Sequence, residues 1–376
     1  MGQVPQLHQE QALLDQFASP KIIAGPHASP ASAPAARRLR DDRDYQDLLK
    51  QLARAGVFAC PWTSIAWRIV VFAGAYVAGF VYLLGNPGLL GCAVASVVIG
   101  LAHIHGNFVA HDAAHGAISK RERINGAIGQ LFDSLLGGYS FDYFRRAHDL
   151  HHFHCNEIDR DVNLMTRMFS LSPQAAAEKT GLWARTTRYQ HILIPLLYPL
   201  WSFALRFEGF GYIWRNRRRA WLDGILIVAH FALWCSLPVL ALGFWRALGC
   251  YTVMTVVTGI YLAVIVPINH VGMPLLDSTS PLSFVAQQVT TTRNLASSPI
   301  RDFLFMGQNS QIEHHLFPWA PTFNLGRGRA IVRAFCEAHD LPYHEHSYWD
   351  ALREVHAYYA RIARLQDRPI AELISV

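Results

Sequence analysis

Four apolar stretches constrain the fold of this 376-residue chain more than any other feature of its sequence. Each is about 20 residues long, and a helix of that length crosses the ~30 Å hydrocarbon core of a bilayer. Two short turns join the stretches in pairs. The sequence therefore predicts an all-α integral membrane protein with four transmembrane helices in two hairpins. The predicted spans cover residues about 65–84, 88–110, 222–242 and 247–268.

The composition supports this class of protein against a soluble or a disordered one. Hydrophobic residues make up 52% of the chain and charged residues 16%, whereas soluble domains average about 25% charged residues. The apolar content also excludes disorder for most of the chain. The formal net charge of +6 is typical both of nucleic-acid-binding proteins and of membrane proteins with a cationic cytoplasmic face.

The distribution of the basic residues favours the second interpretation. With four spans, segments 1–64, 111–221 and 271–376 share one side of the membrane. They hold 7, 15 and 9 of the 33 Lys and Arg residues, so that 31 lie on that side. The positive-inside rule places this side in the cytoplasm. We therefore expect membrane lipid around the spans and no nucleic-acid partner.

The chain before the first span is predicted to be an N-terminal tail, residues 1–60. Residues 1–42 are rich in Ala, Pro and charged side chains, which is typical of a solvated, poorly ordered segment. Residues 44–55 have apolar side chains at helical spacing and predict a short amphipathic helix on the membrane surface.

Residues 61–376 are predicted to form a single membrane domain. Segments 124–141 and 192–207 are apolar but contain Asp or Pro, which predicts interfacial or re-entrant helices. The remaining cytoplasmic segments are expected to form a helical cap over the bundle.

Histidine is unusually abundant, with 19 residues, and several of them lie at or beyond the cytoplasmic ends of the spans. Imidazole is a common metal ligand. Because these histidines share one face of the membrane, they predict a single metal site at the cytoplasmic boundary. The candidate ligands are His111, His115, His148, His151, His152, His270, His314 and His315.

The spacing of these histidines indicates two metal ions. On a helix, residues four apart share a face, as His111 and His115 would, and His148 and His152 likewise. His151 points about 100° away from His152 and so serves a different ion. Eight ligands also exceed the four of a zinc site. Imidazole suits Fe, Cu, Zn and Ni, and the residues alone leave the metal open.

The three histidine motifs, taken with their flanking residues, resemble the membrane-bound fatty-acid desaturases. The first motif is Ala110-His111-Asp-Ala-Ala-His115-Gly116, and the second runs from Arg146 to His152 with Asn156 downstream. The third is Gln311-Ile-Glu-His314-His315, in which Gln replaces the first His, as in the front-end branch of the family. The resemblance covers residues about 60–360.

This resemblance implies a di-iron centre that uses O2. One iron would bind His111, His115, His148, His152 and His314. The other would bind His151, His270 and His315. Further candidates, as ligands or as residues that orient ligands, are Gln311, Asn269, Asp112, Asp149, Asn156, His191 and Glu313.

Two departures from the family pattern bear on partners and on the site. The residues before the first span are too few for a fused cytochrome-b-type domain and contain no His-Pro-Gly-Gly. We therefore expect a separate electron donor of the ferredoxin or cytochrome type, with its reductase. His154 and Cys155 stand where the family more often has Tyr and Thr-like residues.

The expected function is O2-dependent desaturation of a fatty-acyl chain carried by a lipid or a thioester. Segments 124–141 and 192–207 are the expected walls of an apolar tunnel that positions the chain. The alternatives are a related di-iron hydroxylase or desaturase acting on lipids, carotenoids or sphingoid bases, and a metal transporter. Transporters place their ligands near the bilayer midplane, which disfavours the last. The expected location is a bacterial inner membrane, or the endoplasmic reticulum in a eukaryote, with the site facing the cytoplasm.

Overall fold

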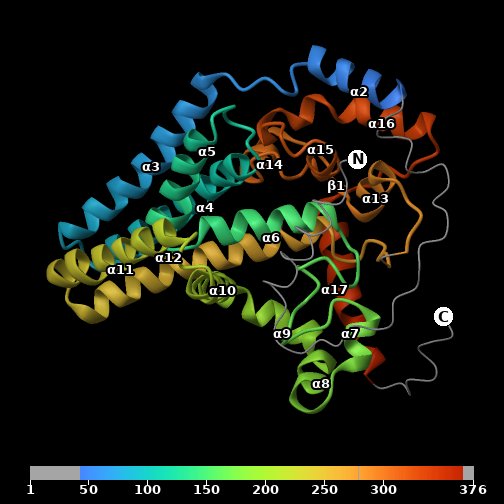
Figure 1. Cartoon of the computed structure of the whole chain (residues 1–376). Helices are drawn as coiled ribbons and strands as arrows, with labels where there is room; N and C mark the ends of the chain where they lie inside the picture. The colour runs from blue at the N-terminus through green and yellow to red at the C-terminus, as the bar shows by residue number, and fades with distance from the viewer. Residues whose placement is uncertain (1–42, 278, 367–376) are drawn as a thin grey trace.

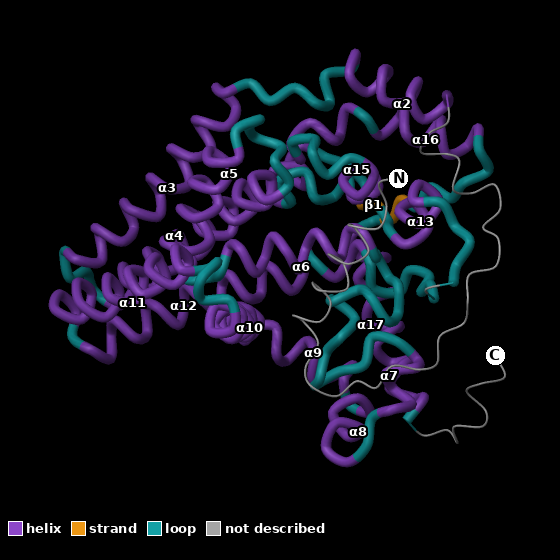
Figure 2. The backbone as a smooth tube through the Cα atoms, in the orientation of Figure 1, coloured by secondary structure: helices purple, strands orange, loops and turns teal. Residues whose placement is uncertain are grey.

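A computed structural model describes residues 43–277 and 279–366, so the prediction for residues 1–42 lies outside the described residues. Within the described part nearly all of the regular secondary structure is helical (Figure 2). Its two strands, β1 (Asn294–Leu295) and β2 (Glu345–His346), form one short parallel pair. The prediction of an all-α protein is confirmed.

Four helices of the described chain are long and apolar enough to cross a membrane. They are α3 (Trp62–Leu84), α4 (Leu89–Ala114), α11 (Trp221–Leu242) and α12 (Phe244–Ile265), the last continued by the 3₁₀ turn η4 (Pro267–Asn269). α3 packs against α4, α11 against α12, and α12 against α4, which confirms the two hairpins (Figure 1). Their outward faces carry exposed apolar side chains such as Val70, Leu90 and Val228, which suit contact with lipid.

Apart from α2, the remaining helices belong to the segment between α4 and α11 or to the part after α12, and most of those after α12 lie toward one end of the bundle (Figure 1). Between α4 and α11 lie α5 (Glu122–Gly129), η2 (Gln130–Gly137), α6 (Phe141–Phe153), α7 (Pro173–Glu178), α8 (Gly181–Arg188), α9 (Gln190–Leu197), η3 (Tyr198–Leu200) and α10 (Trp201–Arg215). After α12 come α13 (Phe284–Thr291), α14 (Pro299–Leu304), α15 (Gln311–Leu316), η5 (Thr322–Arg327), α16 (Arg329–Ala338) and α17 (Tyr348–Leu365).

The amphipathic helix expected before the first span is α2 (Arg43–Arg54), but it does not use its apolar face to bind a membrane. Tyr45, Leu48 and Leu52 are buried in a cluster that includes residues of α15 and α16. The ring of Tyr45 stacks on Phe317 with 6.0 Å between centroids. The surface prediction was therefore wrong in this respect, because a protein partner of matching amphipathic pattern, α16, lies elsewhere in the chain.

The predicted re-entrant segment 124–141 contains a π-helix, η2, packed between α4 and α11. Its last carbonyl groups are bonded by two basic side chains of the neighbouring helices. Arg206 donates to the Gly137 oxygen from Nε (3.1 Å) and Nη2 (2.8 Å), and His230 Nδ1 donates to the Leu135 oxygen at 3.0 Å. The backbone carbonyl groups at the end of this π-helix lie beside spanning helices, where no water is present to donate hydrogen bonds. They therefore need donors from neighbouring side chains. His230 therefore has a structural role and is not among the candidate metal ligands.

Glycines allow η2 to approach α4 closely. A Cβ at Gly106 of α4 would lie 2.1 Å from the ring of Phe132 in η2. We expect Gly106→Ala to lower the stability of the chain by about 1–3 kcal/mol, because a fully buried ring must move to make room. Thermal unfolding of the detergent-solubilised protein, followed by tryptophan fluorescence, measures this.

Gly74→Ala is the matched control for that substitution. Gly74 lies in the spanning helix α3, and a Cβ there would have no neighbouring atom within 4 Å. Because Ala is the better helix former, its unfolding temperature should stay the same or rise slightly. Equal unfolding temperatures for the two variants would contradict the close packing of η2 on α4.

Candidate metal centre

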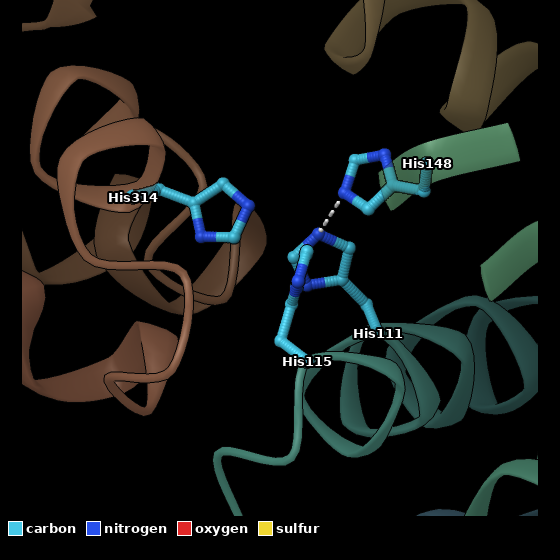
Figure 3. A group of neighbouring side chains, drawn as sticks. All are labelled: His111, His115, His148 and His314. Carbon is cyan, nitrogen blue, oxygen red and sulfur yellow. Dashed lines mark hydrogen bonds between the residues drawn. The ribbon is translucent and has the colours of Figure 1, made fainter. Parts of the chain in front are cut away.

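Four histidines from three helical segments point toward one another at the end of α4 (Figure 3). His111 lies in the last turn of α4 and His115 directly follows it, four residues on. His148 comes from α6 and His314 from α15. The Nε2 atoms of His111 and His148 are 2.8 Å apart, and the four residues offer nitrogens that all lie within 4.8 Å of one another. One ion at their centre would contact all four.

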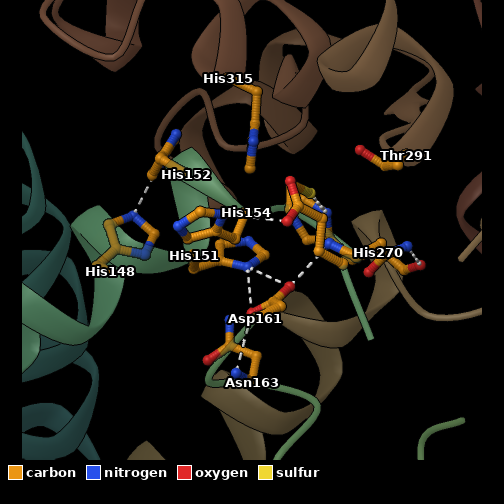
Figure 4. Close-up of polar contacts among 12 residues, drawn as sticks. His148, His151, His152, His154, Asp161, Asn163, His270, Thr291 and His315 are labelled. Atoms are coloured by element: carbon orange, nitrogen blue, oxygen red, sulfur yellow. Dashed lines mark hydrogen bonds and ion pairs between the residues drawn. The ribbon is translucent and has the colours of Figure 1, made fainter. Parts of the chain in front are cut away.

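A second group lies on the other side of α6 (Figure 4). It consists of His151, Cys155, His270 and His315, whose ligand atoms also lie within 4.8 Å of one another. The His151 ring is 4.7 Å from that of His270 and 5.1 Å from that of His315, measured between centroids. The structure thus brings the histidines of the three motifs and His270 into two adjoining groups.

His152 lies between the two groups. Its ring centroid is 4.6 Å from those of His115, His148 and His314, and 4.1 Å from that of His315, on which it stacks. Its Nε2 is 3.2 Å from Nε2 of His148, which places this nitrogen beside the first group.

The donor atoms fit metal ions by two observations. First, several of the buried imidazole nitrogens have no hydrogen-bond partner: Nε2 of His115, both nitrogens of His314, and Nε2 of His315. Buried polar atoms are normally bonded, so unpartnered imidazole nitrogens in both groups fit a role as metal ligands. Second, burial lowers the pKa of His148, His152, His314 and His315 well below the usual value. The neutral imidazole is the form that binds a metal ion.

Three side chains orient the histidines through the ring nitrogen opposite the ion. Both oxygens of Asp161 accept from His151 Nδ1, at 3.0 and 2.9 Å. Gln288 Oε1 accepts from His315 Nδ1 at 2.7 Å, and Gln308 Nε2 lies 3.0 Å from His111 Nδ1. Acceptors such as Asp161 and Gln288 fix the ring and raise its affinity for metal, whereas Gln308 presents an N–H donor to His111. The sequence did not assign this role to any of the three, although Asp161 lies only ten residues after His151, downstream of the second motif.

Three of the further candidate residues do lie at the second group. Asn156 donates from its backbone to Asp161 (2.9 Å) and from its side chain to the His270 carbonyl oxygen (3.3 Å). Gln311 Nε2 is 3.1 Å from His270 Nε2, and Gln311 Oε1 accepts from Asn269 at 3.2 Å. Asn269 and Gln311 therefore form a polar pair beside this histidine.

The other four candidates do not orient a metal ligand by a hydrogen bond. Glu313 accepts from Asn294 and Tyr343, and Asp112 accepts from Thr322, so both carboxylates fasten the cap instead. Asp149 is half-buried and has no hydrogen bond to a histidine in the described chain. His191 lies in a separate groove on α9 and α17. Asp112 nevertheless lies beside the first group, with its Oδ1 atom 3.7 Å from His111 Nδ1.

A cavity of about 300 Å³ opens onto both groups. Histidines from both line it, together with apolar side chains of α4, α10 and α12 such as Phe108, Leu205 and Leu262. Both segments expected as tunnel walls contribute, through Tyr139 and Trp201 among others. α12 and α17 also line the cavity, which the sequence did not indicate.

Comparison with known proteins settles the family. A sequence model described as fatty acid desaturase matches residues 87–347. The chain belongs to the fatty acid desaturase family. This confirms the resemblance that the histidine motifs indicated, and the four spanning helices are those of a membrane desaturase chain.

The family relatives bear names from several lipid classes. The chain is 29% identical over 274 residues to the Delta(6)-fatty-acid desaturase fat-3 of Caenorhabditis elegans, covering 68% of this chain and 61% of that protein. It is 22% identical to an acyl-lipid (9-3)-desaturase of Physcomitrium patens, covering 81% and 59%. It is 25% identical to a Delta 8-(E)-sphingolipid desaturase of Emericella nidulans, covering 83% and 61%. The chain spans about three fifths of the length of these relatives.

Proposed function

We propose that this chain introduces a double bond into the acyl chain of a lipid, using O2, two histidine-bound irons and electrons from a separate donor protein. One observation carries the proposal: the cavity that opens onto both histidine groups is walled mainly by apolar side chains. An alkyl chain would lie in it directly beside the ligand set. The names of the relatives, which are desaturases of fatty acids, acyl lipids and sphingolipids, support the same reaction.

The ligand assignment is part of the proposal. One iron would be held by His111, His115, His148, His152 and His314, and the other by His151, His270 and His315, with Gln311 close to the latter. An unactivated methylene has no acidic proton, and iron with O2 supplies, when bound, the oxidising power that no side chain has. The site would face the cytoplasm, where 31 of 33 Lys and Arg residues would lie.

The residues of the chain supply position. The apolar walls formed by Phe108, Leu205 and Leu262 exclude water and hold the alkyl chain against the histidine groups. Holding a substrate in a reactive geometry supplies much of the rate enhancement of an enzyme. Asp161, Gln288 and Gln308 keep the imidazoles in their orientations, so that the ligand set is formed before substrate enters.

The proposal is tested by expression in a host that lacks such desaturation, with a ferredoxin and a cytochrome-type donor supplied in parallel. Mass spectrometry of total lipids should detect a new unsaturated acyl chain and locate its double bond. A hydroxylated product would favour the alternative, a related di-iron lipid hydroxylase. No oxidised lipid with either donor, from a chain that binds iron, would overturn the proposal.

The position of the acyl chain leads to a separate prediction. Leu205→Trp should fill part of the cavity and keep the acyl chain out of its productive position. Product formation should then fall about tenfold, which corresponds to a rise of roughly 1.4 kcal/mol in the activation free energy. Iron content should be unchanged, since Leu205 does not contact the histidine groups. Ala204→Trp is the control, because Ala204 is exposed and does not line the cavity. Equal product from both variants would show that the acyl chain lies elsewhere.

A further inference from the structure

One buried carboxyl group of the cavity wall has no role in holding the histidines. Asp133, on the π-helix η2, is fully buried, and it lines the same cavity as His111 and Gln308. Its Oδ1 accepts from Asn107 Nδ2 at 2.8 Å, and its Oδ2 has no hydrogen-bond partner. Asn107 precedes His111 by four residues on α4, so Asp133 lies about one helical turn below the first histidine group.

The surroundings of Asp133 favour its neutral form. No Lys or Arg forms an ion pair with Asp133 in the described chain, and a buried carboxylate without a cationic partner is strongly disfavoured. Burial raises the pKa of Asp133 to about 8, and the nearby carboxyl group of Asp223 also contributes to this increase. The closest buried cation, Arg206, directs its guanidinium to the Gly137 oxygen and to Ser202 instead.

We propose that Asp133 is a proton donor to the cavity, which supplies protons consumed when oxygen is reduced beside the acyl chain. This inference rests on the proposed function. Desaturation removes two hydrogen atoms from adjacent carbons and reduces O2 to two waters, which requires two electrons and two protons from outside. The electrons come from the donor protein. The protons come from solvent, one at a time. Asp133 donates the proton of its O–H group to the cavity, and a solvent proton then forms this O–H bond again.

A line of acidic groups leads from the protein surface toward Asp133. Asp142 pairs with Arg219, whose side chain is 62% exposed, at 3.3 Å. The backbone N–H of Asp142 donates to Asp223 Oδ2 at 3.0 Å, and the Ser140 hydroxyl donates to the same carboxylate. Ser140 lines the cavity together with Asp133. These contacts connect the surface with Ser140 at the cavity wall, and a proton would cross the cavity from there to reach Asp133.

The other titratable groups around this part of the cavity are the phenol of Tyr139 and the imidazole of His103. The two rings stack with 5.4 Å between their centroids, and the Tyr139 hydroxyl bonds to Ser202. Neither forms a hydrogen bond with Asp133 in the described chain, since His103 contacts Thr258 and Tyr139 contacts Ser202. The π-helix, with Arg206 and His230 on its terminal carbonyls, holds Asp133 in this position, and such helices are frequent at functional sites.

The first test uses the full-length chain without iron and is independent of turnover. Infrared difference spectroscopy between wild type and Asp133→Asn should isolate the carbonyl band of one neutral carboxylic acid at pH 7. That band should disappear as the pH rises above about 8, because Asp133 is neutral below its pKa and ionised above it. Asp277→Asn, at an exposed site, should leave the band in place. A spectrum in which Asp133 is ionised at pH 7 would overturn the proposal.

The second test uses the iron-loaded chain. Asp133→Asn keeps the shape of the side chain and should keep the iron, but product formation should fall at least about tenfold, with part of the consumed O2 appearing as hydrogen peroxide. Asp133→Glu should restore coupling in part. Wild-type rate and coupling in Asp133→Asn would refute the role. If the wild type itself forms no product, the proposed function fails, and the infrared result still decides the state of Asp133.

Discussion

Replacement of His152 by alanine is expected to lower product formation more than about a hundredfold. Loss of a residue that only orients a ligand histidine typically lowers activity about 10–100-fold, so the effect expected for His152 is larger. His152 lies within 4.6 Å, between ring centroids, of histidines from both groups. Its removal therefore affects both metal positions. The chain should still insert into the membrane, because the four spans do not depend on this side chain. Iron per chain, measured by mass spectrometry on the purified protein, should fall in parallel with activity.

His339→Ala is the matched control for this substitution. His339 follows α16, stacks on Phe335 and bonds to its carbonyl oxygen, and it belongs to neither histidine group. Iron content and product formation should stay close to wild type. An active His152→Ala chain with full iron content would contradict the proposed ligand set.

Asp161→Asn is expected to weaken iron binding at the second group by 10–100-fold, the range found for partners that orient ligand histidines. Both carboxylate oxygens accept from His151 Nδ1, and two backbone N–H groups, of Asn156 and Asn163, also donate to this side chain. An amide keeps the shape but replaces one acceptor by a donor, which leaves a buried donor without an acceptor. Competition with an iron chelator measures the change in affinity.

The neighbouring acid provides the control for this second prediction. Asp159 is exposed and lies two residues before Asp161 in the same motif. Asp159→Asn removes the same charge at almost the same place but no hydrogen bond to a histidine. If both variants lose iron equally, long-range charge rather than orientation of His151 governs binding. Iron retained at wild-type affinity in Asp161→Asn would exclude the orienting role.

The features that the sequence predicted well are those set by local pattern. A run of about 20 apolar residues specifies a spanning helix without knowledge of its neighbours, and the four spans emerged with short turns between them. The four-residue spacing of His111 and His115 likewise needs only helical geometry. Membership of the family followed from the residues around the histidines.

The features that it did not predict depend on contacts between distant segments. Gln288 and Gln308 belong to no histidine motif and reach the site because α13 and the loop before α15 pack beside it. The apolar face of α2 is covered by α16, almost three hundred residues later. Nothing in the local sequence around 130–137 indicated a π-helix, because its conformation depends on the partners of its carbonyl groups. These features depend on how distant segments pack against one another, and a single sequence does not reveal those contacts.

The order of the segments along the chain has a consequence for biosynthesis. The four spans end at residue 269, whereas His314, His315 and the α17 residues Tyr358 and Tyr359 of the cavity wall come later. A ribosome therefore delivers the whole membrane bundle before either histidine group is complete. Under the proposed function, both iron sites would therefore be completed only after the bundle has formed, so the chain would pass through a membrane-embedded form in which neither site is complete.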